Sequence, residues 1–295
     1  MEKPRVAIIG TGIMGAGMAE RLLEQGFAVD VWDRTAATAA RIANRGAIAH
    51  ERPTDAVAAA DIVISMLPTA AVLAAVMLEQ RVLDAMRPNS VWAQMGTIGL
   101  DGTEGLIRET LNRRPDVDFV DAPVSGTRGP ARRGQLIILA SGPDRARAIV
   151  QPVFETLGQR VIWLGRAGMG MRMKLILNTW LAFEIEAAAE IRESAERLGV
   201  SYEALVDTVQ GGPMASPLAL ARLDKMQKGD DSIDFPLEWA LKDLDLTTLA
   251  TGPGAIPVAS AIAERWRGLV ADGLGRRDVT AARLGFKRDL TQVKT

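Results

Sequence analysis

The chain has no cysteine, and His50 is its single histidine among 295 residues. The absence of cysteine excludes thiol nucleophiles, disulfide bonds and cysteine-ligated metals. A histidine metal cage or a Ser-His-Asp triad would depend on His50 alone, and we expect that residue to lie in a surface loop. The sequence therefore predicts no metal site, and it directs the search for a proton-transferring group to lysine.

An excess of charge of one sign is also lacking. The 35 Lys and Arg residues balance 36 Asp and Glu residues, which leaves a net charge of −1. An extended basic surface that would bind nucleic acid or an anionic membrane is therefore not expected. Apolar residues make up 48% and charged residues 24%, as in a globular protein with a sizeable core.

The sequence has no hydrophobic run long enough to span a membrane. One uncharged stretch, residues 62–78, is interrupted by Pro68, and we interpret it as a buried strand, a turn and a helix. The first apolar run, residues 6–9, is too short for a secretory signal and leads directly into Gly10. The sequence predicts a cytoplasmic protein with no membrane or nucleic-acid partner.

Short apolar strands alternate with amphipathic helices as far as about residue 165. The expected strands are 5–9, 27–32, 61–66, 90–94, 118–122, 136–141 and 161–164. The expected helices are 14–25, 36–45, 70–85, 101–113 and 143–157. This alternation predicts βαβ units with a parallel sheet and right-handed crossovers, which is the α/β class.

The pattern changes at the glycine-rich segment 165–168. Beyond it no strand is expected, and residues 170–198 form one long helix of about 43 Å. Further expected helices are 201–209, 217–227, 235–251, 257–272 and 280–284. The sequence thus predicts a Rossmann domain at 1–166 and an all-α domain at 167–295, with the long helix running between the domains. The second domain is expected to serve substrate binding and oligomerisation.

A glycine motif, Gly10-Thr11-Gly12-Ile13-Met14-Gly15, lies between the first strand and the first helix. It fits G-x-G-x-x-G, and Asp33 ends the next strand, as in a dinucleotide-binding fingerprint. Gly10 permits a tight turn, Gly12 lets the backbone approach the pyrophosphate, and Gly15 allows close helix packing. The alternative is a purely structural glycine-rich turn.

The segment Asp33-Arg34-Thr35 gives conflicting signals about the nucleotide. A carboxylate at this place binds the adenosine ribose hydroxyls and repels a 2′-phosphate, which favours NAD. Arg34 and Thr35 offer a partner and a hydroxyl for that phosphate, which favours NADP. We expect NADP or NAD to be used, with a slight preference for NADP or dual use.

Beyond these motifs, the whole chain resembles the β-hydroxyacid dehydrogenase family. That family includes 3-hydroxyisobutyrate dehydrogenases, tartronate semialdehyde reductases and glyoxylate/succinic semialdehyde reductases. The resemblance is carried by the glycine motif with Met18-Ala19, Met66-Leu67-Pro68, Asp121-Ala122-Pro123-Val124-Ser125-Gly126, Gly134, Leu136, Gly168, Met173-Lys174-Leu175 and Lys242-Asp243-Leu244. It implies a C-terminal domain like that of 6-phosphogluconate dehydrogenase.

The resemblance implies a role for individual residues. Lys174 matches the catalytic lysine. The implied substrate-binding residues are Ser125, Gly126, Thr127 and Asn178. The implied cofactor-binding residues, besides the glycine motif and Asp33-Arg34-Thr35, are Met66, Leu67, Pro68, Val72, Thr97 and Lys242.

The sequence departs from the family pattern at several positions. Leu177 stands where many relatives carry Asn, and only Asn178 is kept. Met95-Gly96-Thr97 replaces a serine-rich run, and Trp180 is bulky for this place. These departures leave the reaction type intact and leave the substrate open.

Residue chemistry independently favours Lys174. Lys174 and Asn178 are four residues apart and so share one face of the long helix. Apolar neighbours desolvate the ammonium, which is expected to lower its pKa toward the range useful for proton transfer. The alternative is a lysine whose apolar stem lies along a half-buried helix while its head stays in water.

The sequence predicts an NAD(P)-dependent oxidoreductase that interconverts a short β-hydroxyacid and its semialdehyde. Hydride transfer would be coupled to a proton moved by Lys174. Alternatives are an imine reductase on the same fold and a catalytically silent nucleotide-binding module. A small carboxylate substrate is the expected ligand. A homodimer or homotetramer is expected because the helical domain would otherwise expose apolar faces.

Overall fold

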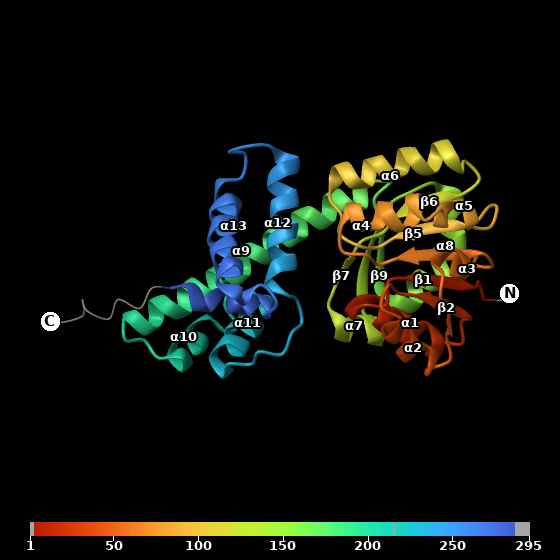
Figure 1. The fold of residues 1–295 in the computed structure, drawn as a ribbon. Helices are drawn as coiled ribbons and strands as arrows, with labels where there is room; N and C mark the ends of the chain where they lie inside the picture. The colour runs from red at the N-terminus through yellow and green to blue at the C-terminus, as the bar shows by residue number, and fades with distance from the viewer. Residues whose placement is uncertain (1–2, 215, 287–295) are drawn as a thin grey trace. The chain divides into compact units, whose positions relative to one another are not determined.

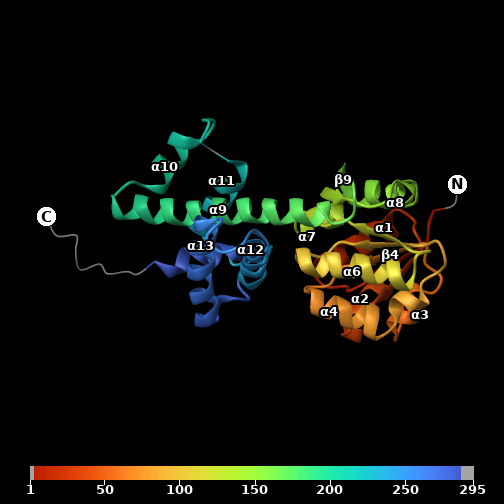
Figure 2. The same ribbon diagram turned by 90° about the horizontal axis from the view of Figure 1, so that it is seen from above.

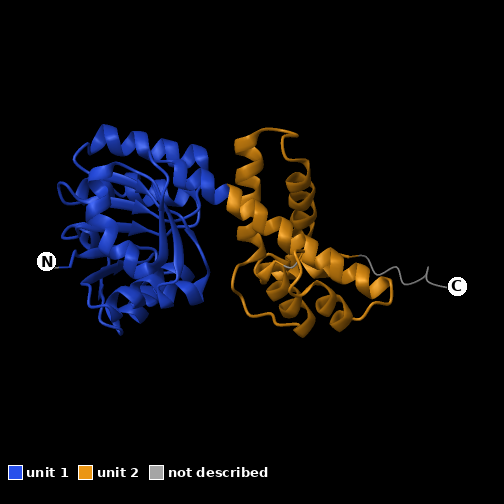
Figure 3. Cartoon of the chain, turned by 180° about the vertical axis from the view of Figure 1, so that it is seen from behind, with its two compact units in different colours: residues 1–175 blue, residues 176–295 orange. Residues whose placement is uncertain are grey.

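A six-stranded parallel sheet forms the centre of the N-terminal unit (Figure 1). The computed structural model describes residues 3–214 and 216–286. Its two compact units are Met1–Leu175 and Ile176–Thr295 (Figure 3). The strands are β1 (Val6–Ile9), β2 (Val29–Trp32), β3 (Ile48–Ala49), β4 (Ile62–Ser65), β5 (Val91–Gln94) and β6 (Asp118–Asp121). Their order is β3-β2-β1-β4-β5-β6. The strands run outward from β1 to β3 on one side and from β4 to β6 on the other, so the strand order reverses between β1 and β4, where open α/β sheets bind ligands.

Helices cover both faces of this sheet, so the expected α/β architecture is confirmed. They are α1 (Ile13–Glu24), α2 (Ala36–Ala43), α3 (Pro53–Val57), α4 (Ala70–Ala74), α5 (Val82–Ala85), α6 (Leu100–Arg113), α7 (Arg128–Arg133) and α8 (Asp144–Leu157). Helices α1 and α8 contact each other on one face, and α4 and α6 contact each other on the other (Figures 1 and 2). Five of the strands are fully buried, as short apolar runs in a parallel sheet should be.

The expected single helix over residues 70–85 is wrong. Helix α4 passes into a π-helical turn, η1 (Ala75–Glu79), and α5 begins only after Arg81. Arg81 has a φ of 59°, in the left-handed region, which ends the helical path. Because no glycine or proline marks this place, the sequence pattern carried no sign of the break.

A second, three-stranded sheet was only partly predicted. It consists of β7 (Val124–Ser125), β8 (Leu136–Ala140) and β9 (Gly158–Trp163), with β7 antiparallel to β8. Two backbone hydrogen bonds between Asp121 and Ser141, of 2.9 and 2.8 Å, connect it to the end of β6. The short elements β3, β7, α3 and α7 were not expected, because they are too short to show a hydrophobic period.

Helix α9 (Met169–Arg197) begins in the N-terminal unit and continues into the C-terminal one. The C-terminal unit adds α10 (Tyr202–Val209), α11 (Pro217–Lys228), α12 (Leu237–Thr251), α13 (Pro257–Leu269), a π-turn η2 (Val270–Leu274) and a 3₁₀ helix η3 (Val279–Gly285). Helices α12 and α13 lie on one side of α9, and α10 and α11 on the other (Figure 2). The buried Trp266 is the largest side chain of the core that they share.

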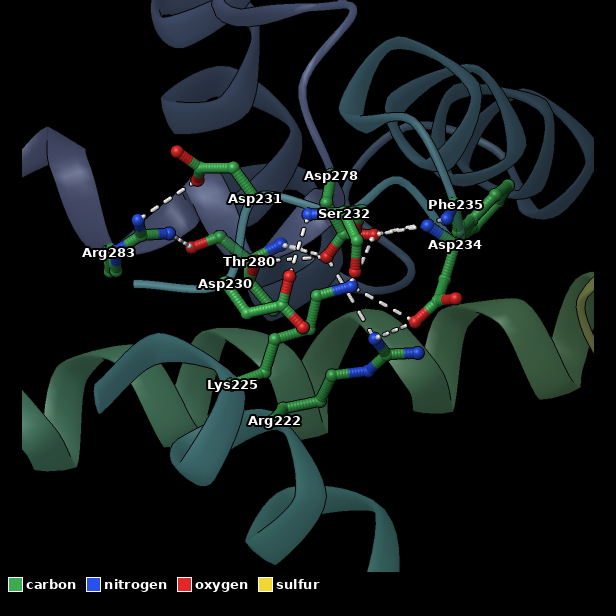
Figure 4. A network of polar contacts seen from close by, with 10 residues as sticks. All are labelled: Arg222, Lys225, Asp230, Asp231, Ser232, Asp234, Phe235, Asp278, Thr280 and Arg283. Atoms are coloured by element: carbon green, nitrogen blue, oxygen red, sulfur yellow. Dashed lines mark hydrogen bonds and ion pairs between the residues drawn. The ribbon is translucent and has the colours of Figure 1, made fainter. Parts of the chain in front are cut away.

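A buried polar network ties the end of this unit together (Figure 4). Asp278 accepts hydrogen bonds from the backbone N–H groups of Asp234 and Phe235, at 2.9 and 3.1 Å. Lys225 lies 3.0 Å from the Asp234 carboxylate and 3.5 Å from that of Asp278. The network joins α11, the loop before α12 and η3.

The predicted location and the predicted domain boundary concern the whole chain. Within residues 3–214 and 216–286, no helix is both long enough and apolar enough to cross a membrane. The cytoplasmic location stays a prediction. So does the functional division at residue 166, since the compact units meet inside α9, between Leu175 and Ile176.

Candidate active site

The three motif glycines have different surroundings. A Cβ atom on Gly10, whose φ is +100°, would lie 2.6 Å from the Met66 carbonyl oxygen. A Cβ on Gly15 would lie 1.9 Å from the Gly10 oxygen. A Cβ on Gly12 would have nothing within 4 Å. Gly10 and Gly15 are thus required by packing, whereas Gly12 borders open space that a ligand can enter.

The start of α1 faces that space. Gly12 is the N-cap residue, and in the described structure neither a side-chain cap nor an acidic residue covers the first turn. Ile13 is exposed and Met14 is half-buried. The first N–H groups and the positive helix pole therefore remain for an anion. The open backbone at Gly12 and this helix end fit the pyrophosphate of a dinucleotide.

Asp33 connects the end of β2 to the glycine loop. Its Oδ2 accepts the backbone N–H of Thr11 at 2.8 Å and the Thr11 hydroxyl at 3.2 Å. Its Oδ1 accepts the N–H of Thr35 at 2.9 Å. Arg34 and Thr35 are exposed. The carboxylate therefore shapes the loop, while its remaining lone pairs and Arg34 are the groups left for a nucleotide.

The loops after β4 and β5 meet the glycine loop at the carboxyl edge of the sheet. A Cβ on Gly96 would lie 2.4 Å from the Leu67 oxygen, and one on Gly10 would lie 2.8 Å from Leu67 Cδ2. Met66 and Leu67 are half-buried, and Pro68 is exposed. The N–H of Val72 donates to Thr69 Oγ1 at 3.2 Å in the first turn of α4. The structure thus brings the predicted Met66–Pro68 loop beside the predicted glycine motif.

Gln94, at the end of β5, was missed by sequence reasoning. It is fully buried, accepts the N–H of Gly96 at 2.9 Å and donates to the Gly96 oxygen at 2.7 Å. The Ser65 hydroxyl donates to it at 3.3 Å. Gln94 therefore fixes the backbone that leads into Thr97. An uncharged polar residue ending a fully apolar strand was the available signal.

The predicted substrate segment follows β6. Ser125 lies in β7 opposite Ile137, and Thr127 is the N-cap residue of α7. Gly126 has a φ of +130°, and a Cβ there would lie 2.8 Å from Leu136 Cδ2, so this position needs glycine. Helix α7 packs against α1. The segment is thus held against the helix that starts at the glycine motif.

Lys174 lies in the second turn of α9, and two buried residues anchor the first turn. Asp121 Oδ2 accepts the N–H of Met171 at 2.7 Å, and Ser141 Oγ accepts the N–H of Gly170 at 2.9 Å. Burial raises the pKa of Asp121 to about 7, against the lowering effect of its hydrogen bonds to Met171 and Ser141. Sequence reasoning placed Asp121 only within a motif.

The remaining predicted residues lie in the C-terminal unit. Asn178, 8% exposed, donates from Nδ2 to Asp243 Oδ2 at 2.5 Å. Lys242 Nζ lies 2.9 Å from Asp243 Oδ1 and 5.8 Å from the centre of the Trp239 ring. One buried carboxylate thus joins the predicted substrate asparagine to the predicted cofactor lysine. Sequence reasoning gave Asp243 no role of its own.

His50 lies in a loop, as expected, but it is half-buried and paired. Its Nε2 lies 2.7 Å from Asp30 Oδ1, and the buried Asp30 also binds Arg5 at 2.6 Å. His50 follows β3, which pairs with β2, so the unpredicted strand explains its half-buried place. In the part of the chain that the structure describes, no three His, Asp or Glu side chains gather as a metal site requires.

The fold and these loops define an NAD(P)-dependent oxidoreductase, and comparison with known proteins gives its family. Residues 5–165 match the NAD binding domain of 6-phosphogluconate dehydrogenase. Residues 168–284 match the NAD-binding domain of NADP-dependent 3-hydroxyisobutyrate dehydrogenase. The chain belongs to the β-hydroxyacid dehydrogenase family, and it uses NADP or NAD.

Individual relatives agree with this assignment. The chain is 34% identical over 280 residues to glyoxylate/succinic semialdehyde reductase 1 of Arabidopsis thaliana, covering 94% of this chain and 96% of that protein. It is 30% identical over 286 residues to 2-(hydroxymethyl)glutarate dehydrogenase of Eubacterium barkeri, covering 95% and 94%.

Solved structures give the same picture. A Mycobacterium tuberculosis 3-hydroxyisobutyrate dehydrogenase with L-serine has a TM-score of 0.87 and 28% identity, covering 96% of this chain and 99% of that one. An imine reductase from Myxococcus stipitatus is 21% identical with a TM-score of 0.59, covering 97% of this chain and 100% of that one. That second likeness shows the fold alone.

Proposed function

We propose that the protein interconverts a short β-hydroxyacid and its semialdehyde, with Lys174 moving the proton that accompanies hydride transfer. The observation that carries this proposal is the placement of Lys174. It lies on a helix whose first turn is fixed to Asp121, at the carboxyl edge of the sheet that also carries the glycine motif. The nicotinamide supplies or accepts the hydride when bound, and the chain's residues orient the reactants and handle the proton.

The groups proposed to hold the dinucleotide come mainly from the carboxyl edge of the sheet. The open backbone at Gly12 and the start of α1 receive the pyrophosphate. Asp33, Arg34 and Thr35 face the adenosine ribose. The full set is Gly10, Gly12, Ile13, Met14, Gly15, Asp33, Arg34, Thr35, Met66, Leu67, Pro68, Val72, Thr97 and Lys242. The close backbone contacts among the loops at Gly10, Leu67 and Gly96 support this assignment.

The substrate proposed for this site is a short carboxylic acid. Ser125 offers a hydroxyl, and Gly126 and Thr127 offer unhindered N–H groups, which together suit a carboxylate. Asn178 offers an amide held by Asp243. The names of the relatives support the class, since they refer to glyoxylate, succinic semialdehyde and a hydroxymethyl diacid, and one similar structure contains L-serine.

Lys174 acts as the general acid in reduction and the general base in oxidation. In reduction its ammonium gives a proton to the oxygen of the carbonyl that receives the hydride. In oxidation its amine takes the hydroxyl proton as the hydride leaves. Positioned proton transfer of this kind contributes roughly 10²–10⁴ in rate.

A homodimer or homotetramer is proposed for the assembly. Ile176, Trp180 and Ile191 share one face of α9 and are 57%, 62% and 51% exposed. Helix α10 buries none of its residues. Apolar side chains left in this pattern suit a second copy of the chain. Light scattering of the wild type and of Trp180→Glu tests this, and a wild-type monomer contradicts it.

The activity is tested by comparing Lys174→Ala with Lys228→Ala, a lysine exposed on α11 and paired with Asp224. A panel of semialdehydes and cyclic imines is offered with NADPH and NADH. We expect semialdehyde turnover to fall at least roughly 100-fold in Lys174→Ala and to stay unchanged in Lys228→Ala. Turnover of imines alone by the wild type would favour the imine reductase alternative. No turnover, with dinucleotide still bound, would favour a silent module.

A further inference from the structure

Asp121 and Ser141 occupy the junction of three elements in the N-terminal unit. Their backbones exchange hydrogen bonds that join β6 to the start of the loop after β8. Their side chains accept the first N–H groups of α9, from Met171 at 2.7 Å and Gly170 at 2.9 Å. Ser141 Oγ also lies 3.2 Å from the Asp121 carbonyl oxygen. Both residues are fully buried.

The first turn of α9 packs tightly at this junction. A Cβ on Gly170 would lie 2.2 Å from the Leu139 oxygen and 2.8 Å from the Asp121 oxygen. The helix backbone is therefore pressed directly against the ends of β6 and β8. Only a glycine permits this approach, and the two side-chain hydrogen bonds fix the rotation of the helix about its axis.

Asp121 also begins the predicted substrate segment. The chain runs from Asp121 through Pro123 to Ser125, four residues later. Lys174 follows Met171 by three residues, which is one turn of α9. Asp121 is thus the shared anchor of the segment that carries Ser125 and of the helix that carries Lys174.

We propose that Asp121 is a positioning residue that holds Lys174 in register with the substrate-binding segment at Ser125, by fixing the first turn of α9. This inference rests on the proposed role of Lys174. Asp121 has no contact with the reacting atoms in this proposal. It acts through helix geometry, and through the negative charge that it places at the positive end of the helix.

The charge of Asp121 is the electrostatic part of this proposal. Arg172, on α9, is the charged group that lowers the pKa of Asp121, and it is itself paired with Glu104 of α6 at 2.7 Å. Above about pH 7, where Asp121 is ionised, it places a negative charge at the positive start of α9. Asp121→Asn removes that charge.

The test compares Asp121→Asn with Asp118→Asn. Asp118 lies at the other end of β6, is 8% exposed and binds Arg145 at 2.8 Å. It is therefore a buried, paired aspartate on the same strand but outside the site. We expect Asp121→Asn to lower kcat about 10–100-fold, with the dinucleotide Kd kept within about threefold of the wild type. Asp118→Asn should leave both kcat and that Kd unchanged.

Ser141→Ala is the second variant, for the case in which Asp121→Asn fails to fold. It leaves the carboxylate and removes the acceptor of the Gly170 N–H, so kcat should fall about threefold to tenfold. The inference is overturned if the folded variants keep the kcat of the wild type. It is also overturned if kcat and dinucleotide affinity fall together, as in a general loss of structure.

Lys174→Ala separates this inference from the proposed function. If Lys174→Ala keeps turnover within about tenfold, the role of Lys174 fails. If that variant is inactive and Asp121→Asn behaves as the wild type, only the positioning role fails. In the supporting outcome, the double variant Asp121→Asn/Lys174→Ala is no slower than Lys174→Ala alone, because both changes remove the same proton transfer.

Discussion

The backbone N–H of Thr11 donates a hydrogen bond of 2.8 Å to Asp33 Oδ2, which joins the glycine loop to the end of β2. The carboxylate also accepts the N–H of Thr35 at 2.9 Å. Asp33 therefore has two tasks, since it shapes the loop and carries a negative charge where the adenosine ribose is proposed to bind. A substitution of Asp33 changes both the loop and the charge. Only the ratio of catalytic efficiencies with NADPH and NADH isolates the effect of the charge.

The first prediction concerns that ratio. Asp33→Asn removes the repulsion of a 2′-phosphate, so the ratio of NADPH to NADH efficiency should rise. Arg34→Ala removes a phosphate partner, so the ratio should fall. At an effective dielectric near 20 a close charge pair is worth up to about 4 kcal/mol before solvent screening. Because the two effects oppose each other, the wild type should discriminate by less than roughly two decades in kcat/KM.

Absolute efficiencies give the internal control for this prediction. Asp33→Asn should lower kcat/KM with both cofactors, because the amide replaces an oxygen that accepts hydrogen bonds from the loop. The exposed Arg34 makes no such contribution to the loop. Ratios that move in the same direction in both variants would show that these side chains do not face the ribose.

The second prediction concerns Ser125. If its hydroxyl holds a substrate carboxylate, Ser125→Ala removes one charge-assisted hydrogen bond, typically about 1.5–3 kcal/mol. The kcat/KM for a semialdehyde with a carboxylate should then fall by roughly 10–150-fold. A neutral aldehyde of similar size serves as the control and should change much less. Equal losses for both aldehydes would mean that Ser125 only supports β7.

The parts of the fold with a strong hydrophobic period could be predicted from the sequence. Strand β1, helix α1 and the long helix α9 lie within one or two residues of their expected bounds. The two-residue strands β3 and β7 could not be predicted, because they form by pairing with β2 and β8 and have no local period. The break at Arg81 could not be predicted either, because no glycine or proline marks it. The half-buried place of His50 depends on β3 and was missed with it.

The residues of the candidate site also fall into those that could be predicted from the sequence and those that could not. Residues that would touch a ligand directly, such as Gly12 and Lys174, carry a motif or a chemical signature. Residues that hold those groups in place, such as Asp121 and Asp243, are recognised only from their contacts, since each binds a partner distant in the sequence. A single sequence contains the side chain but not the pairing.

The third prediction concerns the buried network around Asp278 (Figure 4). Asp278→Ala removes one of the two carboxylates that pair with Lys225, which is 8% exposed. It also leaves the backbone N–H groups of Asp234 and Phe235 without their acceptor. Breaking a buried pair in this way typically costs about 3–5 kcal/mol. Urea unfolding should show this loss. Asp224→Ala, which removes the exposed partner of Lys228, is the control and should leave the unfolding midpoint unchanged.

The pH dependence of this network has a definite sign. Burial raises the pKa of Asp278, but N–H donation from Asp234, Phe235 and Thr280 outweighs it, so the pKa is lowered. A carboxyl with a lowered folded-state pKa contributes stability above its unfolded pKa, near 3.8, and that stability is lost as the pH falls through the folded value. Wild type should therefore lose stability on acidification below about pH 4 more steeply than Asp278→Ala.

The last prediction concerns Asp121, whose pKa shift has the opposite sign. Burial raises its pKa from 3.8 to about 7, despite the hydrogen bonds from Met171 and Ser141. Between these two values the folded chain keeps a proton that the unfolded chain has lost. The contribution of Asp121 to the free energy of unfolding must therefore decrease as the pH rises through that window.

Asp121→Asn removes this dependence, because an amide does not titrate. Urea unfolding of wild type and variant at several pH values between about 4.5 and 7.5 gives the difference in unfolding free energy at each pH. That difference should shift in favour of the variant as the pH rises, and it should level off above about pH 7, where the carboxyl is ionised in both states. Using a difference cancels the contribution of Asp278, which both proteins share. A difference that stays constant across the range would show that Asp121 is already ionised in the folded protein at pH 4.5.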